Sequence, residues 1–207
     1  MQRILLITIC LLVLGAVSIA VAAPTVEVSG KIELHELNMA SNDALNGLEM
    51  VVETAGVYYH YGNRHNAGPR GLTDAFAPDA PTRNMIISGK GEVTVRWELG
   101  AVPAEGRELK LIRAFWSMED PARNRVNVKF AVRDAATGEW RDVCAYIPAV
   151  GNDRWTEDNT YRSVTLTFPA GEVKGFDAIR MYEGAGVASI YPSRWVEVDA
   201  FVGPPGK

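Results

Sequence analysis

The stretch RAFWSMEDPARNRVNVKFAVRDAATGEWRDV, Arg113–Val143, decides the fold class of this chain. It predicts a strand, a polar loop, a second strand, a tight turn at Gly138 and a third strand that opens on Trp140. In the second strand apolar residues alternate with mostly polar ones, a pattern typical of a strand with one buried face. Such half-buried strands belong to an antiparallel sheet that packs on one side. The apolar positions are Val126, Val128, Phe130 and Val132.

The polar loop inside this stretch is the first place to look for a binding site. It places Trp116, Arg123 and Arg125 near one end of the predicted sheet. Loops carry binding residues more often than core strands do, because a rigid scaffold holds them at the surface. Core packing explains Trp116 as well as ligand binding does, so both interpretations stay open for that residue.

The first 22 residues predict a signal peptide that is not part of the fold. Arg3 gives a positive start, residues 4–14 are almost wholly apolar, and residues 20–22 have the small-x-small pattern of a cleavage site. The apolar run is short for a membrane-spanning helix, and an uncleaved anchor is the alternative. We expect a secreted, periplasmic or extracellular protein in which residues 23–207 form a single domain, with no transmembrane segment after removal of the signal.

Charge and cysteine content exclude several functions. Without the leader the chain has 20 basic and 25 acidic residues, scattered without a basic stripe, so nucleic acid is not expected as a partner. Cys144 is then the only cysteine and cannot form an internal disulfide, so we interpret it as a small buried hydrophobic residue. No histidine follows His65 to act as its base, and no Cys or His spacing typical of a metal site occurs.

Short strands separated by turns continue on both sides of the central stretch. About eight to ten of them, with no long helical period, predict an all-β fold, an antiparallel β-sandwich of the jelly-roll type. The further strands are expected within 24–37 (one or two strands), 48–61 (two strands, or a short helix within 42–54), 92–99, 109–116, 141–147, 163–168, 176–183 and 194–202.

Residues 62–91 are the least regular part of the sequence, with five glycines and three prolines in thirty positions. An irregular segment of this length in a compact domain is usually functional or disordered. Its charged residues, among them His65 and Asp74, favour a functional loop. A solvated surface loop is the alternative interpretation.

Five motifs, taken in chain order, have counterparts in one known fold family. They are GLTDAF at 71–76, VTVRWELG at 93–100, LIRAFW with ARNRVNVKFAVRDAATGEW within 111–140, FDAIRMYEG at 176–184 and WVEVDAFVG at 195–203. Together they resemble the galactose-binding-like β-sandwich family, which includes discoidin-type domains and the family 32 carbohydrate-binding modules. The resemblance covers about residues 57–203, and it implies a β-sandwich that binds carbohydrate without catalysis.

The resemblance also implies a structural calcium ion, which members of this family often hold between the first loop and the last strand. Asp74 matches the acidic residue of that loop, and Glu197 matches the acidic residue of the closing strand. Calcium takes about six to eight oxygen ligands, several of which can be backbone carbonyls, so two acids can suffice. A turn cap for Asp74 and an exposed strand position for Glu197 are the alternative.

A sugar site is the second implication of the resemblance. Family members often use an arginine just before the central strand, together with a histidine and aromatic residues on nearby loops. Arg125 matches that arginine, and His65, Trp116 and Trp155 are the candidates for the other roles. Arginine offers forked donors to sugar hydroxyls, and an aromatic ring packs against the apolar C–H face of a pyranose. We expect Trp97 and Trp140 in the core and Trp195 on the outward face of its strand.

Three functions are open at this point. The first is an exported, non-catalytic carbohydrate-binding module whose partner is a glycan or an extracellular polysaccharide. The second is a structural or adhesive surface module that binds a protein. The third is a glycan hydrolase or lyase, because the acid pairs Glu119/Asp120 and Glu157/Asp158 could serve in acid–base chemistry. No nucleophile–base motif accompanies these acids, so we expect no enzyme.

Overall fold

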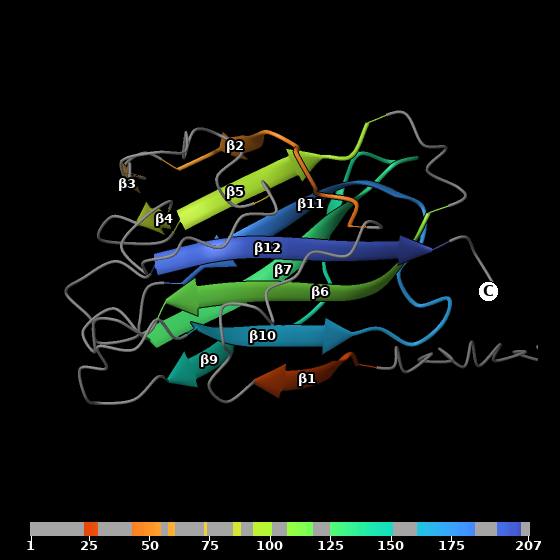
Figure 1. The fold of residues 1–207 in the computed structure, drawn as a ribbon. Helices are drawn as coiled ribbons and strands as arrows, with labels where there is room; N and C mark the ends of the chain where they lie inside the picture. The colour runs from red at the N-terminus through yellow and green to blue at the C-terminus, as the bar shows by residue number, and fades with distance from the viewer. Residues whose placement is uncertain are drawn as a thin grey trace, which may run out of the picture.

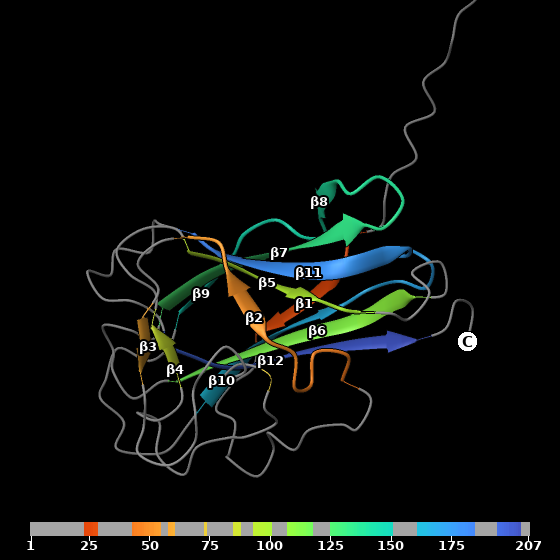
Figure 2. The same ribbon diagram turned by 90° about the horizontal axis from the view of Figure 1, so that it is seen from above.

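Two β-sheets packed face to face make up the computed structural model of the chain (Figures 1 and 2). The structural statements below concern the residues that the structure describes. These are 23–28, 43–54, 58–60, 73, 85–87, 93–100, 107–117, 125–150, 161–184 and 194–203. In these ranges no helix is long and apolar enough to cross a membrane.

The first sheet contains six strands in the order β1-β10-β6-β12-β4-β3, and every neighbouring pair is antiparallel. In Figure 1 its strands β12, β6, β10 and β1 form the layer nearest the viewer. The long strands β6 and β12 form its centre. The bounds are β1 Thr25–Val28, β3 Tyr58–His60, β4 Met85–Ile87, β6 Glu108–Ser117, β10 Tyr161–Thr167 and β12 Arg194–Gly203.

The second sheet has the order β2-β5-β11-β7-β8, with β9 also pairing with β7, and it too is antiparallel. Figure 2 shows this layer, with β7 and β11, stacked on the layer that contains β6 and β12. The bounds are β2 Met50–Val52, β5 Val93–Glu98, β7 Arg125–Asp134, β8 Trp140–Asp142, β9 Ile147–Val150 and β11 Phe176–Glu183. The predicted all-β antiparallel sandwich is therefore confirmed.

The central stretch folds as its alternation predicts. Its apolar positions in β7 are all fully buried, whereas Asn127, Lys129 and Arg133 are partly exposed. Gly138 takes a φ of 74° in the turn between β7 and β8, a left-handed conformation that glycine adopts without a steric penalty. The carboxylate of Asp134 closes the same turn by accepting hydrogen bonds from the backbone N–H groups of residues 136 and 137.

Two strand predictions need correction. The strand expected at 141–147 is divided, because residues 143–146 bend between β8 and β9, and β9 then extends to residue 150. The irregular segment 62–91 contains the short strand β4 at 85–87, which pairs with β12 and β3. Residues 43–47 form a bridge and turns, so the short helix considered within 42–54 does not form there.

The core lies between the inner faces of the two sheets. Its largest fully buried side chains include the tryptophans of β5, β6 and β12, which are Trp97, Trp116 and Trp195. Trp116 and Trp195 contact each other edge to face, with ring centroids 6.0 Å apart. Burial of a large aromatic side chain contributes about 1.5–3 kcal/mol, so these rings account for much of the inter-sheet attachment.

Two of the tryptophans differ from the sequence prediction. Trp195 points inward, because a bulge between Trp195 and Glu197 shifts the alternation of β12, and its indole donates a hydrogen bond to Glu183 at 3.1 Å. Trp140 is half-buried on the outer face of the second sheet rather than in the core. A bulge is invisible to simple alternation, and it reverses the side on which every preceding residue lies.

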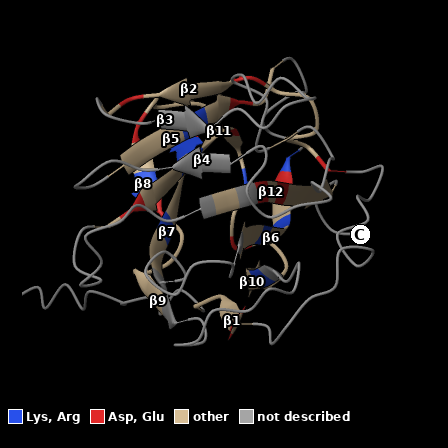
Figure 3. Cartoon of the chain, turned by 60° about the vertical axis from the view of Figure 1, so that its left-hand side comes forward, with Lys and Arg blue, Asp and Glu red and all other residues tan. Residues whose placement is uncertain are grey.

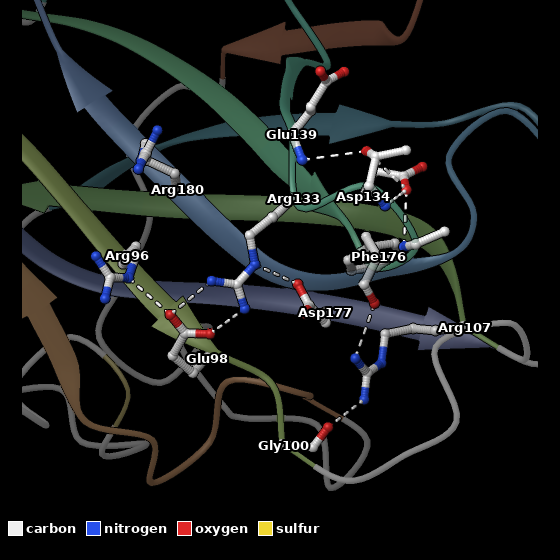
Figure 4. Close-up of polar contacts among 12 residues, drawn as sticks. Arg96, Glu98, Gly100, Arg107, Arg133, Asp134, Glu139, Phe176, Asp177 and Arg180 are labelled. Carbon is white, nitrogen blue, oxygen red and sulfur yellow. Dashed lines mark hydrogen bonds and ion pairs between the residues drawn. The ribbon is translucent and has the colours of Figure 1, made fainter.

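A buried arginine joins three segments at one end of the sandwich. The guanidinium of Arg107 donates hydrogen bonds to the carbonyl oxygens of Phe176, Leu99 and Gly100, at 3.0, 3.3 and 3.5 Å. Figure 4 shows the bonds to Phe176 and Gly100. The carbonyl of Arg107 accepts a hydrogen bond from Gly175. The end of β5, the start of β6 and the start of β11 are thus held together by one side chain.

We predict that Arg107→Lys destabilises the fold by about 2–4 kcal/mol, because a single ammonium nitrogen cannot reach carbonyls that the guanidinium contacts through two separate nitrogens. Urea unfolding followed by tryptophan fluorescence measures the change. Arg141→Lys, at an exposed position of β8, is the matched control and is expected to change stability by about 0.5 kcal/mol or less. Equal effects of the two substitutions would contradict the role given to Arg107.

Candidate functional site

The residues predicted for the loop sugar site fall largely outside the described ranges. Arg123, His65 and Trp155 lie outside them, as do Asp74 and both acid pairs considered for catalysis. Arg125 is the first residue of β7, and its backbone is in register with Val150 of β9. Trp116 is fully buried against Trp195, so its ring is not available to stack on a ligand. Of the two interpretations of Trp116, the structure supports core packing.

A cluster of three carboxylates lies on the outer face of the first sheet. Oxygens of Asp43, Glu197 and Asp199 all lie within 4.8 Å of one another. Glu197 and Asp199 are two positions apart on β12, so their side chains share one face of the strand. Asp43 reaches them because its residue bridges to Phe201 at the start of the turn that leads to β2.

Hydrogen bonds fix two members of this carboxylate cluster. One oxygen of Asp43 accepts from the backbone N–H groups of Leu45 and Ala200, at 3.0 and 2.7 Å. One oxygen of Asp199 accepts from the guanidinium of Arg113, at 3.1 and 3.3 Å, while its other oxygen, Oδ1, is buried and accepts no hydrogen bond. The buried Oδ1 is therefore a coordination position that the protein atoms leave open.

Burial disfavours the ionised form of the acids in this carboxylate cluster. Burial and then the neighbouring charge of Asp43 together raise the pKa of Asp199 to about 6, against the lowering effect of Arg113. Burial also raises the pKa of Asp43 above its ordinary value. A hard divalent cation would stabilise the ionised carboxylates, because it prefers carboxylate oxygens as ligands and its positive charge balances theirs. The donor set therefore fits calcium.

The cluster corresponds only partly to the predicted calcium ligands. Glu197 belongs to it, whereas Asp74 lies outside the described residues. Asp43 and Asp199 were not singled out from the sequence. Asp199 could have been found from its spacing of two residues from Glu197, but nothing local in the sequence connects Asp43 to a strand more than 150 residues later.

A second group of polar and aromatic side chains covers the outer face of the second sheet. Aromatic rings and cations alternate in it, and we call it the aromatic–cation row. Arg180 lies 3.7 Å from the ring centroid of Trp140, and Lys129 lies 4.5 and 5.1 Å from those of Tyr182 and Tyr146. The members are Trp140 of β8, Arg180 and Tyr182 of β11, Lys129 of β7, and Tyr146 between β8 and β9.

Strand register explains why this row forms. Arg180 is opposite Ala131 of β7, and Tyr182 is opposite Lys129. Because Ala131 is small, the guanidinium of Arg180 can extend across β7 toward Trp140 on the next strand. Trp140 and Tyr182 are half-buried, and the side chain of Tyr146 is 38% exposed, so the row lies at the surface.

Ion pairs surround the row on the same face, and Figure 3 shows both signs of charge there. Glu53 joins Arg180 and Arg96, and Asp142 joins Lys129 at 2.9 Å. Arg133 lies between Glu98 and Asp177, with dashed lines to both in Figure 4. Partial burial raises the pKa of Glu53, but hydrogen bonds from Arg180 and Arg96 bring it below its ordinary value. Glu53 is therefore charged and paired near neutral pH.

An apolar cavity of about 650 Å³ opens between the sheets beside β1. Val26 and Val28 have the core-facing parity of their partners Leu166 and Val164, yet they are 43% and 41% exposed. The half-buried thiol of Cys144 lines the cavity, and burial raises its pKa. A protonated thiol is a poor nucleophile, which agrees with the interpretation of Cys144 as a small hydrophobic residue.

No protein-family model and no curated protein matches this chain. Among solved structures, it is similar to a family 32 carbohydrate-binding module of AlyQ, solved in complex with 4,5-unsaturated mannuronic acid. The identity is 11%, the TM-score is 0.39, and the match covers 73% of this chain and 98% of the module. A family 32 module from a family 31 glycoside hydrolase of Clostridium perfringens is similar at 9% identity and a TM-score of 0.42, with 78% and 97% covered.

A larger protein, SpGH29, is similar at 14% identity and a TM-score of 0.44 over 79% of this chain. The chain spans only 28% of the length of SpGH29. At these identities and TM-scores the likenesses assign neither ligand nor activity to this chain.

The raised pKa of Asp199 predicts that stability falls as the pH rises from about 4 to about 6. The folded state holds the proton on Asp199 up to about pH 6 and the unfolded state releases it near 3.8, so raising the pH favours unfolding. The native chain should therefore lose about 2–3 kcal/mol of unfolding free energy relative to the Asp199→Asn variant over this interval, because Asn does not titrate. Urea unfolding in EDTA at several pH values measures it, and a difference that stays constant with pH would contradict the prediction.

Proposed function

We propose that this chain is an exported, non-catalytic carbohydrate-binding module. The observation that carries the proposal is the aromatic–cation row on the outer face of the second sheet. Its rings are partly exposed, and they are held rigidly by cations that are themselves ion-paired. A rigid, surface-exposed array of aromatic rings and paired charges is poorly explained by the needs of the core, which lies on the other side of the same sheet.

The chemistry of the row suits a sugar. A pyranose has an apolar C–H face that packs against an aromatic ring, and hydroxyl groups that both donate and accept hydrogen bonds. Tyr146 and Tyr182 offer ring surface and hydroxyl groups, while Asp142 and Glu98 offer acceptor oxygens at the edge. Because the rings are fixed before binding, little side-chain entropy is lost on association.

A loop site is a second location for the ligand within the same proposal. It would comprise Arg125 at the start of β7, which matches the arginine of the resembling family, together with Arg123, His65 and Trp155 as candidates from the sequence. The two locations make different predictions for single substitutions, so the same binding experiment separates them.

We also propose that the carboxylate cluster holds a structural calcium ion. Asp43, Glu197 and Asp199 would supply the side-chain oxygens, and backbone carbonyls or water would complete the coordination. The ion would neutralise the buried acids and attach the turn after Asp43 to β12. Its role is stabilisation of the fold at the first sheet, away from the outer face of the second.

The apolar cavity beside β1 favours one alternative, an adhesive module that binds a protein. Val26, Val28 and Tyr146 are three of the four large hydrophobic residues that are exposed in the described part of the chain. Apolar surface gathered at one edge is a common feature of protein-binding sites. If the protein binds no glycan on an array, protein binding becomes the better-supported function.

We predict that the chain from residue 23 onward binds glycans on an array, and that Trp140→Ala weakens binding about tenfold, equivalent to about 1.4 kcal/mol. Loss of the ring removes both a stacking surface and the support of Arg180. Lys174→Ala, at an exposed position outside the row, is the matched control and should leave binding unchanged. Isothermal titration with the best array ligand gives the affinities.

Two results of that titration would count against the row. Binding that is insensitive to Trp140→Ala but lost in Arg125→Ala would move the site to the loop. Failure to bind any glycan, with the fold verified by its unfolding transition, would overturn the carbohydrate proposal itself.

We predict that calcium raises the melting temperature by several degrees, since a ligand at about 100 times its dissociation constant stabilises the native state by about 2.7 kcal/mol. Glu197→Gln and Asp199→Asn should abolish the shift. Asp177→Asn, on the other sheet, is the control that should retain it. A shift that persists in both cluster variants would show that calcium binds elsewhere.

A further inference from the structure

In most ion pairs on the outer face of the second sheet, the carboxylate is more exposed to solvent than the cation that it binds. Asp142 is 55% exposed and its partner Lys129 is 18% exposed. Glu98 is 41% exposed and its partner Arg133 is 26% exposed. Asp177 is likewise more exposed than Arg133. Glu53 is the intermediate case, since it is more exposed than Arg180 but less exposed than Arg96.

We infer that this face selects uncharged glycans and rejects acidic ones such as uronates and sulfated chains. The inference rests on the proposed carbohydrate-binding function and names its ligand class. A ligand that approaches the aromatic–cation row meets the carboxylates of Asp142 and Glu98 first. An anionic sugar is repelled at that distance, whereas a sugar hydroxyl can donate a hydrogen bond to the same oxygens.

The cations of this face, Arg180 and Arg133, are already paired with acids of the protein, which limits their contact with an anionic ligand. Arg180 contacts both carboxylate oxygens of Glu53, at 2.7 and 2.8 Å. Arg133 is held between Asp177 and Glu98, so its guanidinium fork is occupied on two sides. A ligand carboxylate would have to displace one of these acids and break its charge-assisted hydrogen bonds to the guanidinium.

The aromatic rings add a second restraint on the cations. Lys129 lies between Tyr182 and Tyr146, and Arg180 lies against Trp140 and within 5.7 Å of Tyr182. Hydrogen bonding to Asp142 also raises the pKa of Lys129, so its charge persists at neutral pH and remains directed to that acid. The face therefore offers rings and acceptor oxygens to a ligand while its positive charges are committed within the protein.

The test compares two ligands that differ only in charge, namely oligogalacturonate and the oligosaccharide obtained by reducing its carboxyl groups to alcohols. Isothermal titration uses the chain from residue 23 onward at low salt, preceded by an array that includes neutral, uronate and sulfated glycans. We expect the dissociation constant of the charged oligosaccharide to be at least tenfold larger. The ratio should shrink as salt is added, because these carboxylates are exposed and their repulsion is screened.

Isosteric variants assign the discrimination to the named carboxylates. Glu98→Gln and Asp142→Asn should each lower the ratio of the two dissociation constants, and the double variant should lower it most. Glu27→Gln, which removes a charge at an exposed position of β1 on the first sheet, is the matched control and should preserve the ratio.

The outcomes separate the inference from the function on which it rests. Equal or tighter binding of oligogalacturonate, or of any acidic glycan on the array, overturns the selection while leaving carbohydrate binding in place. An unchanged ratio in the double variant overturns the role of these two acids. Binding of no glycan, neutral or acidic, overturns the carbohydrate-binding proposal and the selection with it.

Discussion

Face-to-face packing of two antiparallel sheets is the constraint on which the rest of this structure depends. The inner faces bury Trp97, Trp116 and Trp195 together with the apolar side of β7, and this burial supplies the main driving force for folding. Successive side chains of a strand point to opposite faces of its sheet. When one face of a sheet packs in the core, the side chains on the other face can therefore be polar. The candidate sites are a consequence of that division.

The two outer faces use this freedom in different ways. On the first sheet, Glu197 and Asp199 are buried with Asp43 beneath a turn, which produces a concentrated negative site suited to a cation. On the second sheet, the acids are spread along the surface and paired with Arg and Lys residues that contact aromatic rings. Similar carboxylates thus form the proposed cation site where they are buried, and the proposed hydrogen-bond acceptors for a glycan where they are exposed.

The fold class could be predicted from the sequence because alternation is a local signal, and β7 shows it over eight consecutive residues. The positions of single tryptophans could not. The bulge in β12 turns Trp195 inward, and Trp140 follows a turn whose geometry places its ring outside the core. Asp43 joins the carboxylate cluster through a bridge to Phe201, a contact between distant segments that no local pattern encodes. The row of Trp140, Arg180 and Lys129 likewise depends on strand order and register, which sequence alternation does not specify.

Because the edge beside β1 is open, local unfolding should cost less free energy at β1 than at the central strands β6 and β12. Val26 and Val28 face the core side yet keep much of their surface in solvent, so separation of β1 from β10 exposes little additional apolar area. Separation of β6 from β12 would instead expose Trp116 and Trp195 together. Amide hydrogens of β1 should therefore exchange with solvent through small, frequent openings, whereas those of β6 and β12 should exchange only when the whole domain unfolds.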